Sequence, residues 1–137
     1  MAQKYIEGDI VEYDNKVMAI KEPRDGNHFD LSCHKEGLVY CFVGVEDIKP
    51  VVLTPEILEK NGWRTQNRWY YYLDVAEGFI SYIGIDFKHK SNKGHLYVEV
   101  DGNNMVEIQY CHELQHFLFG LGLKHEMEVY VCHVEVV

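Results

Sequence analysis

The sequence predicts an α+β protein in which a bent β-meander or small SH3-like barrel precedes an antiparallel sheet with one short and one longer helix. Three observations carry this prediction. Residues 1–50 show only strand-type patterning, a capped helical segment follows Lys49-Pro50, and further strand-like runs with a second helical segment complete the chain. We therefore expect one compact unit over residues 1–137, with a β-meander at 1–50 and an α+β part at 51–137.

The predicted meander contains four strands. GDIVEYDNKVMAIKEP indicates two strands around residues 14–16, because β-branched and aromatic residues flank the turn formers Asp-Asn-Lys. HFDLSC and LVYCFVGV indicate the next two strands, which a hairpin-like connection at residues 34–37 separates. Lys49-Pro50 then ends this part of the chain.

LTPEILEKNGW gives the clearest helix signal. Thr54 suits the N-cap, Pro55 suits the first turn, and Asn61-Gly62 suits a left-handed stop. A helix of about two turns is not stable alone in water. Ile57 and Leu58 are therefore expected to pack against a sheet.

The remaining segments predict an antiparallel sheet and a longer helix. WYYYLD, FISYIGIDF, HLYVEV and MVEI are strand-like, and turn formers separate them at residues 77–78, 91–94 and 101–104. A helix is predicted from about residue 109 to 121, where glycines end it. MEVYVCHVEVV indicates a last strand.

Composition excludes several classes of protein. The formal charge of −9 disfavours long nucleic acid as a partner. No apolar run approaches the roughly 20 residues that span a bilayer, and the opening residues lack the apolar segment of a signal peptide. We therefore expect no membrane partner and a cytoplasmic location, with the four cysteines reduced.

The pentapeptide HELQH matches the H-E-x-x-H pattern of zinc metallohydrolases. Two histidines one turn apart, His112 and His116, can both bind zinc while Glu113 polarises the metal-bound water. The metzincin extension is absent, because Phe119 and Gly122 stand where its glycine and last histidine are required. The glutamates that follow lie on strand-like sequence, which is the wrong scaffold for a third ligand.

The helical periodicity also disfavours a zinc site. At 100° per residue the apolar residues gather on one side of the helix, and His112 and His116 project nearly opposite. The apolar side consists of Tyr110, Cys111, Leu114, Phe117, Leu118 and Leu121. We therefore expect the two histidines to face solvent as an ordinary polar surface.

A basic and aromatic middle segment is the best candidate for a ligand site, with a plain strand that carries aromatic residues on both faces as the alternative. Aromatic rings stack bases, and arginine binds phosphate with two hydrogen bonds. The expected ligand is a small phosphate-bearing, base-containing molecule between the aromatic strand and the loop 88–93, with no cofactor and no catalytic residue. Homo-oligomerisation would help to close such a pocket. The candidate binding residues are Arg64, Arg68, Trp69, Tyr71, Lys88, Lys90 and Lys93.

Three blocks of the sequence, at residues 8–13, 50–63 and 110–115, resemble a large group of small proteins encoded by gut anaerobes, prophages and phages. The late helix of that group carries a Y-x-H-x-L-Q core, and versions without the glutamate or the second histidine are common. The resemblance implies that HELQH is a variant of a structural helix. The matching residues are Tyr110, His112, Leu114 and Gln115. The group has no settled activity to carry over.

These observations predict a non-catalytic phage- or prophage-type accessory protein in the cytoplasm of a bacterial host. Its ligand would be a small nucleotide signal of an antiviral defence system, which it would sequester. Two alternatives stay open. One is a zinc-dependent metallohydrolase that uses His112, Glu113 and His116, and the other is a protein–protein interaction module that blocks a host protein.

Overall fold

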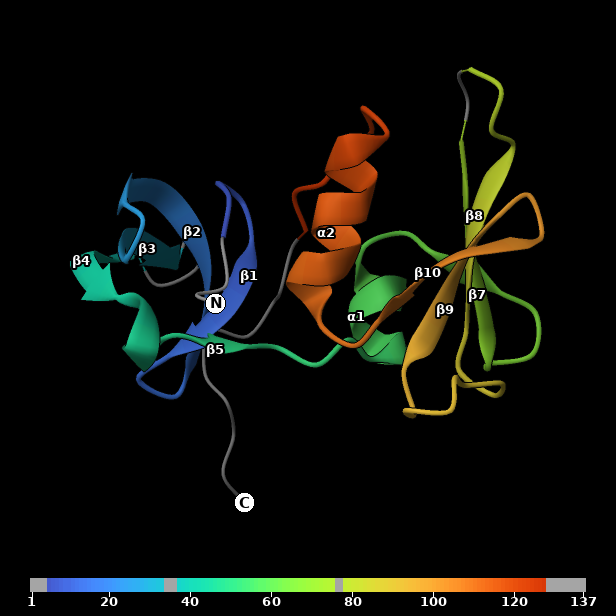
Figure 1. The fold of residues 1–137 in the computed structure, drawn as a ribbon, viewed down its shortest axis with the longest axis horizontal. Coiled ribbons are helices and arrows are strands. Elements are labelled where there is room, and N and C mark those ends of the chain that lie inside the picture. The colour runs from blue at the N-terminus through green and yellow to red at the C-terminus, as the bar shows by residue number, and fades with distance from the viewer. Residues whose placement is uncertain (1–4, 34–36, 76–77, 128–137) are drawn as a thin grey trace. The chain divides into compact units, whose positions relative to one another are not determined.

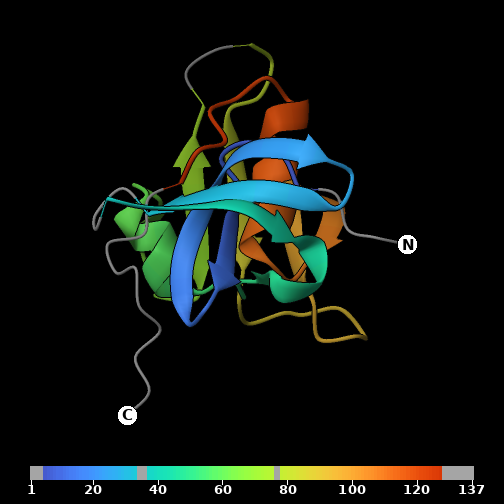
Figure 2. The same cartoon turned by 90° about the vertical axis from the view of Figure 1, so that its left-hand side faces the viewer.

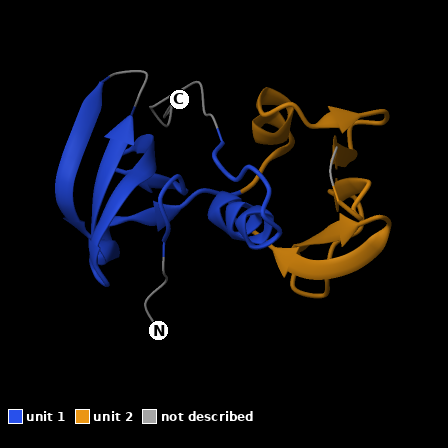
Figure 3. Cartoon of the chain, turned by 90° about the horizontal axis from the view of Figure 1, so that it is seen from above, with its two compact units in different colours: residues 1–52, 110–137 blue, residues 53–109 orange. Residues whose placement is uncertain are grey.

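Two antiparallel five-stranded sheets account for most of the structure, a computed structural model that describes residues 5–33, 37–75 and 78–127. Two helices accompany the sheets, so the predicted α+β class is confirmed (Figure 1). The chain divides into two compact units, residues 1–52 with 110–137 (unit 1) and residues 53–109 (unit 2) (Figure 3). Each unit contains one of the sheets.

The sheet of unit 1 is the predicted meander. Its strand order is β4-β3-β2-β1-β5, and every neighbouring pair is antiparallel. β2 carries two register shifts, which bend the strand (Figure 2). The edge strands are β4 and β5, so closure into an SH3-like barrel stays a prediction. The elements are β1 (Ile10–Tyr13), β2 (Lys16–Asp25), β3 (His28–Cys33), β4 (Leu38–Gly44), the 3-10 helix η1 (Val45–Asp47) and β5 (Lys49–Pro50).

The predicted turn between the first two strands is present. Tyr13 pairs with Lys16, and the two residues between them, Asp14 and Asn15, have φ of 53° and 60°. Positive φ at both central residues is the signature of the tight turn that matches the twist of a hairpin. Asp and Asn tolerate this conformation better than most residues, which explains why the local sequence predicted the turn.

Helix α2 (Cys111–Gly120) belongs to unit 1 and packs against β1. The Gln115 side chain, 0% exposed, fixes this packing. Its Oε1 accepts the Ile10 backbone N–H at 2.8 Å, and its Nε2 donates to the Gly8 carbonyl at 2.7 Å. A residue near the end of the chain therefore completes the hydrogen bonding of the first strand.

Unit 2 contains the predicted short helix and the second sheet, in the order β10-β9-β8-β7-β6. All neighbouring strands are antiparallel, and the four predicted strands are all present. The two-residue strand β6 was not predicted. The elements are α1 (Pro55–Lys60), β6 (Arg64–Thr65), β7 (Tyr70–Asp74), β8 (Tyr82–Asp86), β9 (Leu96–Val100) and β10 (Asn103–Ile108).

The termini of α1 are those that the sequence predicted. The Thr54 hydroxyl accepts the Ile57 N–H at 3.4 Å, and Pro55 occupies the first turn. Gly62 follows the helix with φ of 86°. Leu58 is 0% exposed, so the helix is held by burial of its apolar side, as expected for so short a helix.

The sheet of unit 2 has two chemically different faces, because successive side chains of a strand alternate. The inner face is apolar and buried: Tyr71, Ile83, Ile85 and Val98 are each at most 2% exposed. The outer face is aromatic and polar, and includes Tyr70, Tyr72, Asp74, Tyr82, Asp86, Tyr97 and Glu99, with Gly84 between them. This outer face positions the candidate site.

The division into parts 1–50 and 51–137 stays a prediction. By its contacts, the late helix belongs to unit 1, together with residues 1–52. The predicted last strand falls at residues 127–137, almost wholly outside the described residues.

Among the cysteines that the structure describes, one differs from the expectation. Cys41 and Cys111 are free thiols, as expected, but Cys33 is disulfide-bonded, so the prediction of a reduced thiol is wrong there. Neither helix that the structure describes has the length and apolar character needed to cross a membrane.

Candidate functional site

Two loops meet at one end of the unit 2 sheet. Tyr70, the first residue of β7, pairs with Asp86, the last residue of β8, and the Phe87 N–H donates to the Trp69 carbonyl at 2.7 Å. The loop before β7 and the loop after β8 therefore lie side by side. This pairing places Trp69 next to the residues that follow Asp86.

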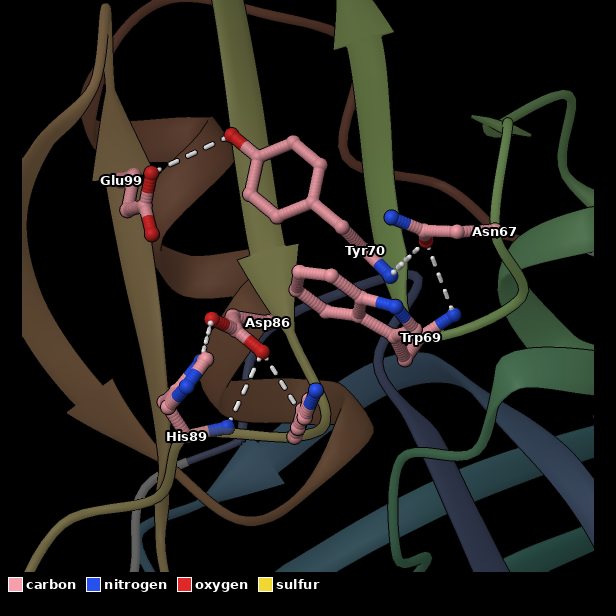
Figure 4. Close-up of polar contacts among 7 residues, drawn as sticks. Asn67, Trp69, Tyr70, Asp86, His89 and Glu99 are labelled. Carbon is pink, nitrogen blue, oxygen red and sulfur yellow. Dashed lines mark hydrogen bonds and ion pairs between the residues drawn. The ribbon is translucent and has the colours of Figure 1, made fainter.

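Asp86 organises the loop after β8. Its Oδ1 accepts the backbone N–H groups of Lys88 and His89 at 2.8 and 3.0 Å, and its Oδ2 lies 2.9 Å from His89 Nδ1 (Figure 4). Burial raises the pKa of the Asp86 carboxyl, but the hydrogen bonds from His89 and Lys88 outweigh burial, so the pKa lies below its ordinary value. Asp86 therefore stays ionised and holds His89 through Nδ1.

The Trp69 ring is surrounded by rings and one cation. The Lys88 ammonium lies 5.3 Å from the centroid of the indole ring, within the range of a cation–π contact. The His89 and Tyr70 rings make edge contacts with the indole, at centroid distances of 5.9 and 6.2 Å. We call Trp69, Asp86, Lys88 and His89 the Trp69 corner. It combines an aromatic ring that neighbouring rings contact with a positive charge.

Five of the seven predicted ligand residues lie on the two loops that form this corner. Trp69 and Lys88 are in contact, as described above. Lys90 and Lys93 are exposed in the connection between β8 and β9. Arg68 is exposed in the loop before β7, where its φ of 68° places it in a left-handed turn. The cations are therefore concentrated at one end of the sheet.

The other two predicted residues are engaged elsewhere. The Arg64 guanidinium lies 3.0 Å from the Asp74 carboxylate and 5.5 Å from the centroid of the Tyr72 ring. Tyr71 is 2% exposed, and its hydroxyl donates to Glu59 Oε1 at 3.0 Å. Tyr71 is thus a core residue of unit 2, and its ring is not accessible for stacking on a ligand.

The outer face also has a hollow of 290 Å³ that the sequence did not reveal, lined by Gln66, Asn67, Tyr70, Tyr72, Asp74 and Tyr82. The Tyr70 ring lies across Gly84, where a Cβ atom would overlap its hydroxyl, and this hydroxyl donates to Glu99 Oε1 at 3.1 Å (Figure 4). The signal in the sequence was the alternation of tyrosines in WYYYLD opposite a strand with a central glycine.

The H-E-x-x-H helix is built differently from the expectation. His112 is 2% exposed, so the prediction that it faces solvent is wrong. Its ring makes an edge contact with Tyr5 and stacks on Tyr110, at centroid distances of 5.2 and 5.8 Å. Burial lowers the pKa of His112 to about 4, so the ring is neutral at ordinary pH. Contacts with other residues of unit 1 bury His112 on the side of the helix that the periodicity predicted to be exposed to solvent.

The other two members of the motif have structural partners. The Glu113 carboxylate accepts the Tyr110 backbone N–H at 2.9 Å and completes a capping box at the start of α2. His116 Nε2 lies 2.6 Å from Asp9 Oδ2. Within the described ranges, no three His, Cys, Asp or Glu residues come together in a group that could hold a metal ion.

Asp9 itself is a buried acidic residue. It is 0% exposed, and burial raises the pKa of its carboxyl, although hydrogen bonds from the Ile6 N–H and from His116 oppose the rise. Its second oxygen, Oδ1, is buried and has no hydrogen-bond partner among the described residues. This carboxylate therefore connects the first residues of unit 1 to α2 at an electrostatic cost.

A larger hollow, of 680 Å³, lies in unit 1. Its lining includes both signs of charge, Lys21 and Lys124 as well as Glu7 and Glu126. The hollow on the outer face of unit 2 differs in that three tyrosines, one carboxylate and two amides line it.

Comparisons with known proteins add no name to these sites. No protein-family model, no curated protein and no solved structure matches the chain significantly.

Proposed function

We propose that the chain is a non-catalytic binding protein that holds a small nucleotide-type ligand at the Trp69 corner. The observation that carries the proposal is the Lys88 ammonium 5.3 Å from the Trp69 ring, with His89 held beside it by Asp86. An indole ring can stack a base, and stacking of this kind contributes about 1–3 kcal/mol. The ammonium can then bind the phosphate of the same molecule.

The charge distribution supports a compact anion over a polymer. Arg68, Lys90 and Lys93 lie on the same two loops as the Trp69 corner, whereas the chain as a whole carries a formal charge of −9. A local positive potential on an acidic chain attracts a small phosphate compound and repels a long phosphate backbone. Arg64 is assigned no role in this site, because its guanidinium lies against Asp74 and the Tyr72 ring.

The biological role that we propose is sequestration. The resemblance to small phage and prophage proteins favours an accessory protein that removes a nucleotide signal of a host defence system, and self-association would close the open corner. A protein of this type needs no catalytic residue. The structural contacts of Glu113 and His116 support this proposal over hydrolysis by the HELQH motif.

Calorimetric titration with linear and cyclic nucleotides tests the proposal. We expect saturable binding that Trp69→Leu abolishes and Lys88→Gln weakens, with mass spectrometry recovering the ligand unchanged. Lys49→Gln, an exposed lysine of unit 1, is the matched control and should bind as the wild type does. Turnover of the ligand would instead establish an enzyme, and absence of binding across the panel would reject the nucleotide site.

A protein-interaction module is the second candidate, and the edge strand β10 favours it. Residues 103–107 are exposed, and Met105 and Val106 are 59% and 38% exposed on an edge that no described strand covers. Exposed edges are templates for strand addition by a partner protein. Val106→Lys should abolish such an interaction and leave nucleotide titrations unchanged, which separates the two candidates.

A further inference from the structure

The hollow on the outer face of unit 2 differs in chemistry from the Trp69 corner. Three tyrosine rings, one carboxylate and two amide side chains line its 290 Å³. We propose that this hollow is an aromatic cage for an alkylammonium group, a ligand of the opposite charge to the nucleotide and independent of it. Tyrosine faces attract cations through the ring quadrupole, and aromatic cages bind methylated ammonium groups in this way.

The geometry of the sheet builds the cage. Tyr70, Tyr72 and Asp74 alternate along β7 and therefore project from the same face. Tyr82 pairs with Asp74 across the β7–β8 ladder, so a third ring stands beside the carboxylate. Gly84 pairs with Tyr72, and because it has no side chain, the Tyr70 ring can lie across it and form one wall of the hollow.

Hydrogen bonds hold one wall of the cage. The Tyr70 hydroxyl donates to Glu99, which keeps the ring across the sheet (Figure 4). Asn67 Oδ1 accepts the backbone N–H groups of Trp69 and Tyr70 at 3.2 and 3.0 Å. The loop that carries Asn67 into the hollow is therefore fixed against β7, so the wall is formed before a ligand binds.

The charge of the lining selects a cation. Asp74 is its charged member, and no lysine or arginine lines the hollow among the described residues. The chain already places a cation of its own at this rim: the Arg64 guanidinium lies 5.5 Å from the Tyr72 centroid and 3.0 Å from Asp74. Both side chains of this ion pair are more than 60% exposed, so the pair is weak and a ligand cation can displace it.

The size of the hollow indicates a small head group. Pockets for drug-sized ligands have volumes of about 300–1,000 Å³, and this hollow lies at the lower limit of that range. A trimethylammonium or primary ammonium head is compact enough to contact several rings at once. The same head group occurs in free amines, in methylated lysine and in phosphocholine.

Titration with choline and with its neutral isostere 3,3-dimethylbutan-1-ol tests the cage. The two molecules have nearly the same shape, so their difference in affinity measures the charge. We expect choline to bind at least about tenfold more tightly, which corresponds to about 1.4 kcal/mol. Equal affinities, or no saturable binding of choline, would overturn the proposal. A trimethyl-lysine peptide and phosphocholine, titrated in parallel, identify which source of the head group binds best.

Variants at the rim give a second readout. Arg64→Gln should raise the affinity for choline, because it releases Asp74 and Tyr72, whereas Asp74→Asn should lower it. Tyr72→Phe keeps the ring and should bind as the wild type does, and Tyr72→Leu should bind about 2- to 5-fold more weakly. A decrease of affinity in Arg64→Gln would contradict the cage. Lys88→Gln serves as the comparison, because Lys88 does not line the hollow: it should weaken nucleotide binding and leave choline binding unchanged.

Discussion

The buried imidazole of His112 predicts that acid destabilises unit 1 through one identifiable group. The ring is 2% exposed, and burial lowers its pKa from 6.5 to about 4. Unfolding returns the ring to water and to its ordinary pKa. The unfolded state then binds the proton more tightly, so the stability that this group contributes is complete above about pH 6.5 and is lost as the pH falls towards 4.

The size of the effect follows from the two pKa values. One pKa unit corresponds to about 1.4 kcal/mol, so the complete shift from 6.5 to about 4 corresponds to about 3.5 kcal/mol. Between about pH 7 and about pH 5 only part of the shift operates, and the expected loss is about 2 kcal/mol. Asp9 acts in the opposite direction, because its raised pKa makes the folded state the tighter proton binder. The effect of His112 is therefore visible only as a difference between two proteins.

His112→Phe is the informative variant, since it removes the titrating group and keeps a ring against Tyr5 and Tyr110. Urea unfolding of both proteins is followed by far-UV circular dichroism at the two pH values. Both tryptophans, Trp63 and Trp69, lie in unit 2, so their fluorescence reports on the unit that lacks the mutation. We expect the variant to lose about 2 kcal/mol less than the wild type on acidification.

Lys49→Gln is the control for this experiment, because Lys49 is an exposed residue of the same unit that has no contact with His112 among the ring contacts described above. It should follow the wild type at both pH values. If His112→Phe showed the same loss on acidification as the wild type, burial of His112 could not be the cause, and the reasoning would be refuted.

Three further predictions concern the cores and the outer face. Gly84→Ala should cost about 1–3 kcal/mol in thermal unfolding and displace the Tyr70 ring, because the new methyl group overlaps its hydroxyl. Gln115→Leu should cost about 2 kcal/mol or more in urea unfolding, since it leaves the buried Ile10 N–H unpaired; a normal midpoint would contradict the assigned bonds. Leu58→Ala should cost about 2–5 kcal/mol, and Trp63 fluorescence measures it.

Local sequence signals predicted the local elements well. The Asp14-Asn15 turn and the ends of α1 depend on residues within a few positions of one another, so their physical causes are visible in the sequence. The position of α2 depends instead on Gln115, which bonds to Ile10 about a hundred residues earlier. Helical periodicity assumes one buried side, and such distant contacts can bury a second.

Only part of the candidate site was predicted, because the rest depends on contacts between distant residues. Composition identified Trp69 and Lys88, which the β7–β8 pairing brings into contact. Strand alternation separates Tyr71 from Tyr70 and Tyr72, but tyrosines on both sides gave no indication of which side is buried. The hollow depends on the position of the Tyr70 ring, which lies across Gly84 of the neighbouring strand. The pairing of β7 with β8 that brings these residues together is a tertiary property.

The division of the chain has a consequence for synthesis. Unit 2 is inserted between Val52 and Tyr110, which form an antiparallel bridge, so the two ends of the insertion lie together at its base. During synthesis, unit 2 is therefore complete before unit 1, because α2, which packs against β1, follows unit 2 in the chain. β1 ends at Tyr13 and α2 ends at Gly120, so at about 5–20 residues per second β1 is made about 5–20 seconds before α2 is complete. Until α2 is made, only the other strands of the sheet, or a chaperone, can shield the apolar side of β1 from water.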